Sequence, residues 1–306
     1  MDTDRRMAVV LVLQAAIVGG LVAAGLAAHS VGLLSAAGHN LADVGAVALS
    51  LVAVRLAARK PTASRSFGYH RSTVLAAQAN AAGILAISVF IVVAAASRLS
   101  HVHHVRGGVV LVAALGDFAL NGVSALLLRG ARGAHHGHAH GHDHADPDLN
   151  VKAAMLHLAG DALAAAGVAV AGAVILVTGR FDWLDPAISI AIAVLIAWEA
   201  VKLVRATTDV LLESTPSGLD TTALLDTMSN VAGVEDVHDL HAWTITSGLP
   251  VLSAHVVVDP AVLTGNRSAA MLDALQFCLS GHFDVVHSTF QLEPPSHADH
   301  EPSACL

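Results

Sequence analysis

Residues 32–56 read GLLSAAGHNLADVGAVALSLVAVRL, and this stretch decides the fold class. A helix of about 20 predominantly apolar residues crosses the hydrocarbon core of a bilayer. The stretch exceeds that length and is apolar almost throughout, yet His39 and Asp43 lie inside it. We therefore predict a membrane-spanning helix that carries an ionisable pair in its interior.

The whole chain has the composition of a polytopic membrane protein. Of its 306 residues 55% are hydrophobic and only 13% are charged, whereas soluble domains carry about 25% charged residues. The 25 glycines and the many alanines suit close helix packing in a membrane. The first span is too long for the apolar region of a signal peptide and is predicted to be retained. The six predicted spans are 7–28, 32–56, 74–97, 107–128, 151–177 and 184–204.

The basic residues predict the orientation. With a cytoplasmic N-terminus, twelve Lys and Arg of the first 205 residues fall on the inner side and three on the outer side. Because cytoplasmic loops carry the excess of Lys and Arg, we predict a cell (inner) membrane protein with both termini cytoplasmic.

After Arg205 the chain changes character. Residues 206–306 hold thirteen acidic residues and one basic residue, which excludes nucleic acid and anionic lipid as partners of this part. Residues 231–259 alternate like two strands around a turn at Ser247 and Gly248, with helical patterns on either side and a last strand at 285–293. We predict an all-α six-helix membrane bundle plus a small αββαβ, ferredoxin-like domain. The predicted organisation is 1–205 with a His-rich cytoplasmic loop at 134–148, then 206–293, then a flexible tail at 294–306.

A second ionisable pair matches the first. Residues 156–162, LHLAGDA, place His157 and Asp161 four apart, as His39 and Asp43 are. Residues at i and i+4 share one helix face, and a carboxylate in hydrocarbon is costly unless it is paired or binds a cation. If the two helices face each other, the four groups form an N₂O₂ shell that suits Zn²⁺ and cancels its charge. Protons would replace the metal on the carboxylates. Each pair could instead form only a contact within or between helices.

Several stretches together resemble the cation diffusion facilitators, in particular their zinc-transporting branch. The order and spacing match over nearly the whole chain. The matching stretches are SAAGHNLADV at 35–44, SFGYHRSTVLAAQAN at 66–80, LHLAGDALA at 156–164, DPAISIAIAVLI at 185–196, VHDLHAWTITSGLPVLSAHVVV at 237–258 and HSTFQLE at 287–293.

The resemblance implies a homodimeric Zn²⁺/H⁺ antiporter that exports zinc, and possibly Cd²⁺ or Co²⁺, by alternating access. It implies transport ligands at His39, Asp43, His157 and Asp161. It also implies a metal site in the cytoplasmic domain that senses zinc, with Glu293 as a weaker candidate ligand. The histidines expected there are His238, His255 and His287.

Other polar residues keep two interpretations. The family has an acidic residue after the HR at 70–71, where this chain has Ser72 and Thr73. Asp117 in the fourth span, with Asn121, is either a relay or a buried hydrogen-bond partner and is kept out of the site. Asp209 pairs with Arg71 or Arg55, or is solvated.

The His-rich loop and the tail also keep two interpretations. The loop holds six His between 135 and 144, and either collects zinc or is a solvated linker. The tail offers His297, His300 and Cys305 without fixed geometry.

Two rival functions remain at this point. One is a membrane-anchored zinc sensor or buffer that moves no ion, and the other is an intramembrane zinc hydrolase built on His39 and His157. A hydrolase needs an open coordination position, and four ligands close it. The sequence has no HExxH, GxSxG or Walker motif, so we predict no enzyme activity, no nucleotide partner and an ion gradient as the energy source.

Overall fold

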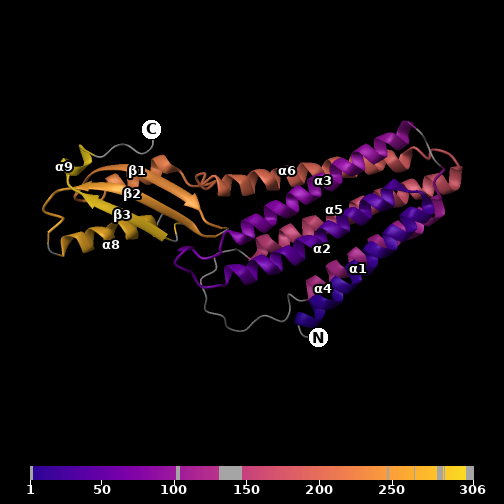
Figure 1. Cartoon of the computed structure of the whole chain (residues 1–306), viewed down its shortest axis with the longest axis horizontal. Helices are drawn as coiled ribbons and strands as arrows, with labels where there is room; N and C mark the ends of the chain where they lie inside the picture. Colours follow the sequence, from indigo (N-terminus) through magenta and orange to yellow (C-terminus); the bar gives the residue numbers. More distant parts are fainter. Residues whose placement is uncertain are drawn as a thin grey trace. The chain divides into compact units, whose positions relative to one another are not determined.

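The chain forms two units in a computed structural model (Figure 1). The helical unit comprises Met1–Leu56 and Leu75–Arg205, and the sheet unit comprises Ala57–Val74 and Ala206–Leu306. The structure describes residues 3–100, 104–130, 147–246, 248–264, 266–280, 285 and 287–300, without the side chains of 3–11, 13, 124–130 and 147–159.

Six long helices occupy the positions of the six predicted spans in the described part of the chain. Among the described residues, α2, α3, α6 and the part of α5 from Gly160 are long and apolar enough to cross a membrane. The described apolar parts of α1 and α4 are shorter, at Gln14–Ala28 and Gly107–Val123. The helices are α1 (Thr3–Ala28), α2 (Val31–Ala57), α3 (Ser72–Ser100), α4 (Gly107–Gly130), α5 (Pro147–Thr178) and α6 (Leu184–Leu211).

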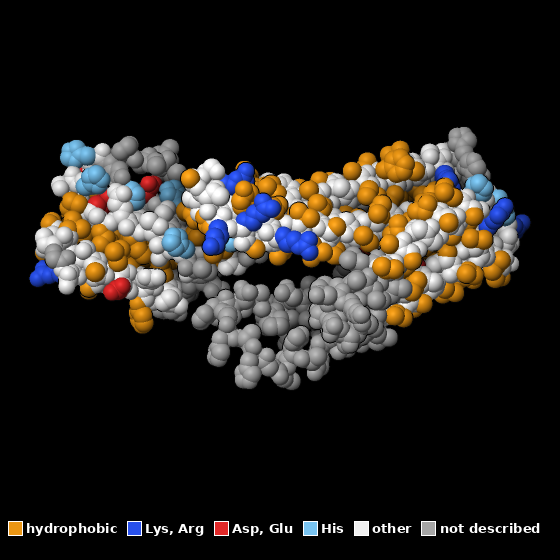
Figure 2. Space-filling model, turned by 60° about the horizontal axis from the view of Figure 1, so that its bottom comes forward, with side chains coloured by type: hydrophobic (Ala, Val, Ile, Leu, Met, Phe, Trp, Pro, Cys, Tyr) orange, Lys and Arg blue, Asp and Glu red, His pale blue; other side chains and the backbone are white. Residues whose placement is uncertain are grey.

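Large apolar side chains point outward from the helical unit. Phe90 and Val112 are each 72% exposed, and Val177 is 84% exposed. Figure 2 shows apolar side chains over the face of this unit in view, with Lys and Arg toward its ends. An apolar outer surface of this kind suits lipid rather than water, as expected for a multi-pass membrane protein.

Helices α4 and α5 approach each other closely because glycines lie at their contact. A Cβ atom on Gly107 would lie 2.6 Å from the backbone nitrogen of Leu176, and one on Gly172 would lie 2.7 Å from that of Leu111. Small residues at such positions let membrane helices pack backbone to backbone. The two helices therefore form a closely packed pair.

The start of α2 is anchored by a carboxylate from α6. Asp185 is buried and accepts hydrogen bonds from the Ser30 hydroxyl and from the backbone N–H groups of Val31 and Gly32. These N–H groups belong to the first turn of α2 and have no partner within the helix. Asp185 thus acts as a cap from another helix and fixes the end of α2 that precedes His39.

The sheet unit has the predicted order of elements. Strand β2 is central, antiparallel to β1 and parallel to β3. This arrangement confirms the αββαβ prediction. Its elements are α7 (Thr221–Ser229), β1 (Val234–Thr244), β2 (Pro250–Val258), α8 (Arg267–Ser280), β3 (His287–Glu293) and α9 (Pro295–Ala298).

Helices α7 and α8 pack their apolar residues into the core of the sheet unit. The Asp220 side chain caps α7 by accepting from the backbone N–H groups of Thr222 and Ala223. Leu224 of α7 and Leu275 of α8 are fully buried in one cluster with Val256 of β2. The sheet is thereby held against the two helices.

Two local features of the sheet unit bear on its polar residues. The β1–β2 register shifts between His238 and His241, and Asp239 has a left-handed φ of 52° there, as at a β-bulge. The one-turn helix α9 lies within residues 294–306, the stretch predicted as a flexible tail.

Candidate metal sites

Three of the four residues predicted to bind the transported ion lie together in the helical unit. His39 Nε2 lies 2.8 Å from Asp161 Oδ1 and 3.7 Å from Asp43 Oδ2. One ligand atom from each residue lies within 4.8 Å of the others. We call His39, Asp43 and Asp161 the intramembrane cluster. Because α2 supplies two of its members and α5 the third, the two helices face each other here, which is the condition for a shared site.

The fourth predicted residue is His157. It lies on α5, one helical turn before Asp161, but its side chain is outside the described residues. The part of His157 in the N₂O₂ shell therefore stays a prediction.

The intramembrane cluster is largely shielded from its surroundings. The side chains of His39 and Asp161 are 15% and 10% exposed, and that of Asp43 is 25% exposed. A cavity of about 20 Å³ adjoins His39 and Asp161, which is room for about one water-sized group. Imidazole and carboxylate groups in such a setting can hold a divalent cation or share protons.

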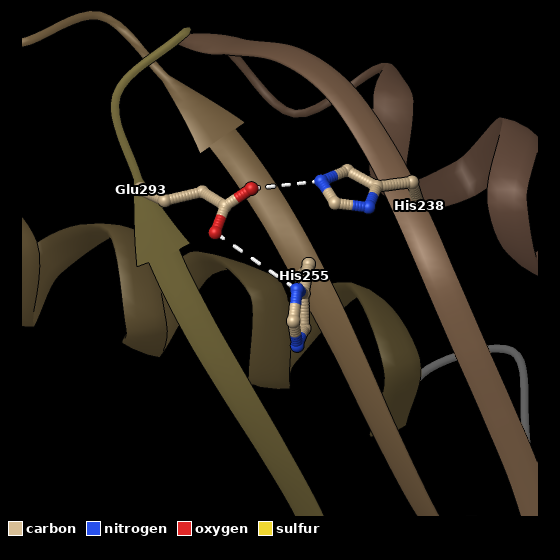
Figure 3. A group of neighbouring side chains, drawn as sticks. All are labelled: His238, His255 and Glu293. Atoms are coloured by element: carbon tan, nitrogen blue, oxygen red, sulfur yellow. Dashed lines mark hydrogen bonds and ion pairs between the residues drawn. The ribbon is translucent and has the colours of Figure 1, made fainter. Parts of the chain in front are cut away.

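A second group of possible ligands lies on the sheet, and we call it the sheet-unit cluster. It consists of His238 on β1, His255 on β2 and Glu293 on β3, whose ligand atoms lie within 4.8 Å of one another. Figure 3 shows the carboxylate of Glu293 directed at both imidazoles. Glu293 Oε1 lies 2.7 Å from His238 Nε2, and Oε2 lies 3.9 Å from His255 Nδ1.

The strand register explains why these three residues meet. His238 and His255 are direct cross-strand partners, and Gln291 of β3 pairs with His255. Because side chains alternate along a strand, Glu293 lies on the same face as Gln291, two residues further on. Glu293 was predicted only as a weaker candidate ligand, and the parallel pairing of β2 with β3 brings it beside the histidines.

His287 does not lie with His238 and His255 in the structure. It pairs with Val251, four residues before His255 on β2. It precedes Glu293 by six residues on β3, which is roughly 20 Å along a strand. One ion cannot contact His287 and the sheet-unit cluster together in this arrangement.

Glu293 is the electrostatic centre of the sheet-unit cluster. Burial opposes its ionisation, but hydrogen bonds from Gln291 and His238 and the nearby His255 outweigh burial. The pKa of the Glu293 carboxyl is therefore lowered from its ordinary value. A carboxylate held ionised beside two imidazoles is a suitable ligand for a divalent cation.

One further histidine of the tail approaches this cluster. His297 on α9 places Nε2 3.9 Å from Glu293 Oε2, while its side chain is 56% exposed. The sequence alone predicts no fixed position for His297. The position follows from α9, which places residue 297 one turn after Glu293.

A link between the loop before α3 and the chain after α6 lies within the sheet unit. Arg71 donates to Glu213 Oε1 at 2.7 Å, so its ion pair in the structure is with Glu213 and not with Asp209, which was one of the three alternatives for Asp209. Thr73, which with Ser72 follows the HR of residues 70–71, shares a hydrogen bond of 2.7 Å with the Thr246 hydroxyl. The polar contact at this position is thus made by two neutral hydroxyls.

Comparison with known proteins agrees with both units. Residues 7–212 match the cation efflux transmembrane domain, and residues 216–295 match the cytoplasmic domain of cation efflux proteins. This chain belongs to the cation efflux family. Cation efflux proteins of this kind are the cation diffusion facilitators, and the relatives place the chain in the zinc branch.

Two curated relatives and one solved structure illustrate the similarity. The "Zinc transporter ZitB" of Escherichia coli (strain K12) is 34% identical, over 90% of this chain and 82% of that protein. The "Cadmium, cobalt and zinc/H(+)-K(+) antiporter" of Bacillus velezensis is 32% identical, over 89% and 83%. A structure titled "Metal-bound C-terminal domain of the CzcD transporter from Cuprividus metallidurans" is 36% identical, covering 24% of this chain and 99% of that one, with a TM-score of 0.23.

Membership of the cation efflux family settles the class of function. The chain is a multi-pass membrane transporter of zinc and related cations, and it is not an enzyme. The rival interpretation as an intramembrane hydrolase is thereby excluded.

Proposed function

We propose that this protein is a secondary-active Zn²⁺/H⁺ antiporter that exports zinc from the cytoplasm by alternating access. The observation that carries the proposal is the intramembrane cluster, in which His39 and Asp43 of α2 meet Asp161 of α5. With His157, two neutral imidazoles and two carboxylates would cancel the charge of one Zn²⁺. A neutral total lowers the cost of holding the ion inside a membrane.

Proton coupling follows from the same groups. The contact of 2.8 Å between His39 Nε2 and Asp161 Oδ1 is of hydrogen-bond length, so one proton can be shared by two atoms that would also ligate the cation. Metal ligation requires deprotonated groups. Zinc entering from the cytoplasm therefore releases protons, and protons entering from outside release zinc. The name of the Bacillus velezensis relative, which includes H(+), is consistent with this exchange.

The sheet-unit cluster is proposed to bind zinc as a regulatory ligand. His238, His255 and Glu293 supply two nitrogens and a carboxylate, and His297 is the candidate fourth donor. A tetrahedral zinc site takes four such ligands. Zinc bound here would draw α9 onto the sheet, because His297 belongs to α9.

Assembly and placement are proposed from the sequence and the family. We expect a homodimer, which the family of the cytoplasmic domain supports. We also infer that both termini lie in the cytoplasm and the helices in the cell (inner) membrane, and the excess of Lys and Arg on one side of the spans supports this orientation.

The test uses purified protein in liposomes that contain a zinc-sensitive dye and a pH-sensitive dye. We expect zinc entry with opposite proton flow, and loss of both in Asp43→Ala and Asp161→Ala. Glu199→Gln is the matched control, because Glu199 is a carboxylate of α6 that is 71% exposed. Deletion of residues 134–144 should leave most of the flux. Zinc binding without flux would instead indicate the membrane-anchored sensor or buffer.

A further inference from the structure

A buried hydrogen-bonded group adjoins the intramembrane cluster on its α4 side. Asp117 of α4 is 6% exposed, and Asn40 and Asn121 are each 3% exposed. Both amides donate to the same oxygen, Asp117 Oδ1, each at 3.1 Å. Buried polar groups are costly unless they are hydrogen-bonded, and here each of the three has such a bond.

The group reaches the intramembrane cluster through neighbouring positions of α2. Asn40 directly follows His39, and consecutive helix residues point about 100° apart. His39 is therefore bonded toward α5, through Asp161, while Asn40 is bonded toward α4, through Asp117. One turn of α2 is thus held from two sides.

The two helices that hold this turn are themselves closely packed. The contact of α4 with α5 at Gly107 and Gly172 leaves no room for a Cβ atom. Asp117 and Asp161 consequently belong to one closely packed pair of helices. Both residues, with His39, Asn40 and Asn121, line the same cavity of about 20 Å³.

We propose that Asp117 is a positioning residue for the transported cation, acting through Asn40. Its carboxylate holds α2 at the rotation and height at which His39 meets Asp161. This inference rests on the proposed function, because it concerns the same cation site. It assigns a role to a residue that the spacing of the His and Asp pairs does not include.

Asn121 provides a matched comparison within the same group. Its amide donates to the same oxygen as that of Asn40, but it lies on α4 itself, four residues after Asp117. Removing Asn121 takes one bond from the carboxylate and leaves the link between α2 and α4. Removing Asn40 breaks that link. The positioning role therefore predicts different consequences for two chemically identical losses.

The experiment measures the KM for zinc and the maximal rate of transport in liposomes, with the thermal unfolding temperature of each variant in detergent. We expect Asp117→Ala and Asn40→Ala each to raise the KM about 10-fold or more, the size of a lost charge-assisted hydrogen bond. Asn121→Ala should raise it less than about 3-fold, because its bond joins two residues of α4 and the link between α2 and α4 remains. Asp117→Asn keeps an acceptor oxygen and should restore the KM to within about 3-fold of the wild type.

The double variant Asp117→Ala with Asn40→Ala tests whether Asp117 acts through Asn40. Residues that act through one bond give non-additive effects, so its KM should match that of the more impaired single variant. Multiplying effects, or unchanged KM values with lowered unfolding temperatures, would overturn the positioning role. If Asp117→Ala does not fold, Asn40→Ala against Asn121→Ala gives the same decision. A wild type without zinc flux would instead refute the proposed antiport, so the two failures are distinguishable.

Discussion

Replacing Glu293 by Gln removes the charge of the sheet-unit cluster and keeps its shape. The carboxylate is 2% exposed and lies 2.7 Å from His238 Nε2 and 3.9 Å from His255 Nδ1. Gln keeps one oxygen for a metal, but it is neutral and is a poorer zinc ligand than a carboxylate. We expect the zinc affinity of this cluster to fall strongly while the fold of the unit persists.

The size of the expected loss in zinc affinity follows from the role of Glu293 as a metal ligand. Replacing residues that only support a metal ligand costs 10- to 100-fold in affinity. Glu293 would itself ligate the metal and is the one carboxylate of the cluster. The expected loss in Glu293→Gln is therefore at least about 100-fold.

The assay is zinc titration of the full chain in detergent against a chelating dye. Asp43 and Asp161 are replaced by Asn and residues 134–144 are deleted, so that the remaining tight binding reports the sheet-unit cluster. His287→Ala is the matched control on the same strand, and it should change the affinity less than about 2-fold because no ion can bridge the roughly 20 Å. Equal losses in Glu293→Gln and His287→Ala would refute the site as described.

Three further predictions concern packing, capping and pH. Gly172→Ala should lower the free energy of unfolding by about 1–3 kcal/mol, because the new Cβ atom would lie 2.7 Å from a backbone nitrogen. Gly116→Ala is the control and should leave the free energy of unfolding unchanged, because a Cβ atom there would have nothing within 4 Å. Thermal unfolding measures both. Asp185→Asn should lower the free energy of unfolding by about 1–2 kcal/mol by weakening the cap of α2, and an unchanged unfolding temperature would contradict this. The lowered pKa of Glu293 means that its ionised form stabilises the folded state above the ordinary value of 4.5. The protection factors of the β3 amides, which correct for the slower intrinsic exchange in acid, should therefore fall as pH drops below that value, and Glu293→Gln should lose this dependence.

Most of the fold was predictable because its signals are local. The apolar runs predict α2 closely, at 32–56 against Val31–Ala57 in the structure. The last span was predicted to end at 204, whereas α6 continues to Leu211. Alternation and a turn gave β1 and β2, and Gly248 adopts the positive φ of 78° that such a turn requires. The cap of α2 by Asp185 was not predictable, since it joins residues 155 positions apart.

The two metal sites were predictable to different extents, because one depends on local spacing and the other on contacts between distant parts of the chain. The four-residue spacing of His39 and Asp43 fixes a common helix face, and the structure brings Asp161 to that face. The sheet-unit cluster depends on strand register, which the sequence does not specify, so His287 was ranked above Glu293. The sequence leaves two interpretations of Asp117 open, and in the structure Asp117 accepts hydrogen bonds from Asn40 and Asn121.

The most direct test of the central claim is X-ray absorption at the zinc edge, on full-length protein in which His238 and Glu293 are replaced by Ala and residues 134–144 are deleted. A zinc ion held between α2 and α5 predicts four nitrogen and oxygen neighbours at about 2.0–2.2 Å, with imidazole scattering and no sulfur. The signal should vanish when Asp43 and Asp161 are also replaced by Ala. Zinc that stays bound in that variant, or a shell of six oxygens, would contradict a cation site built from these two helices.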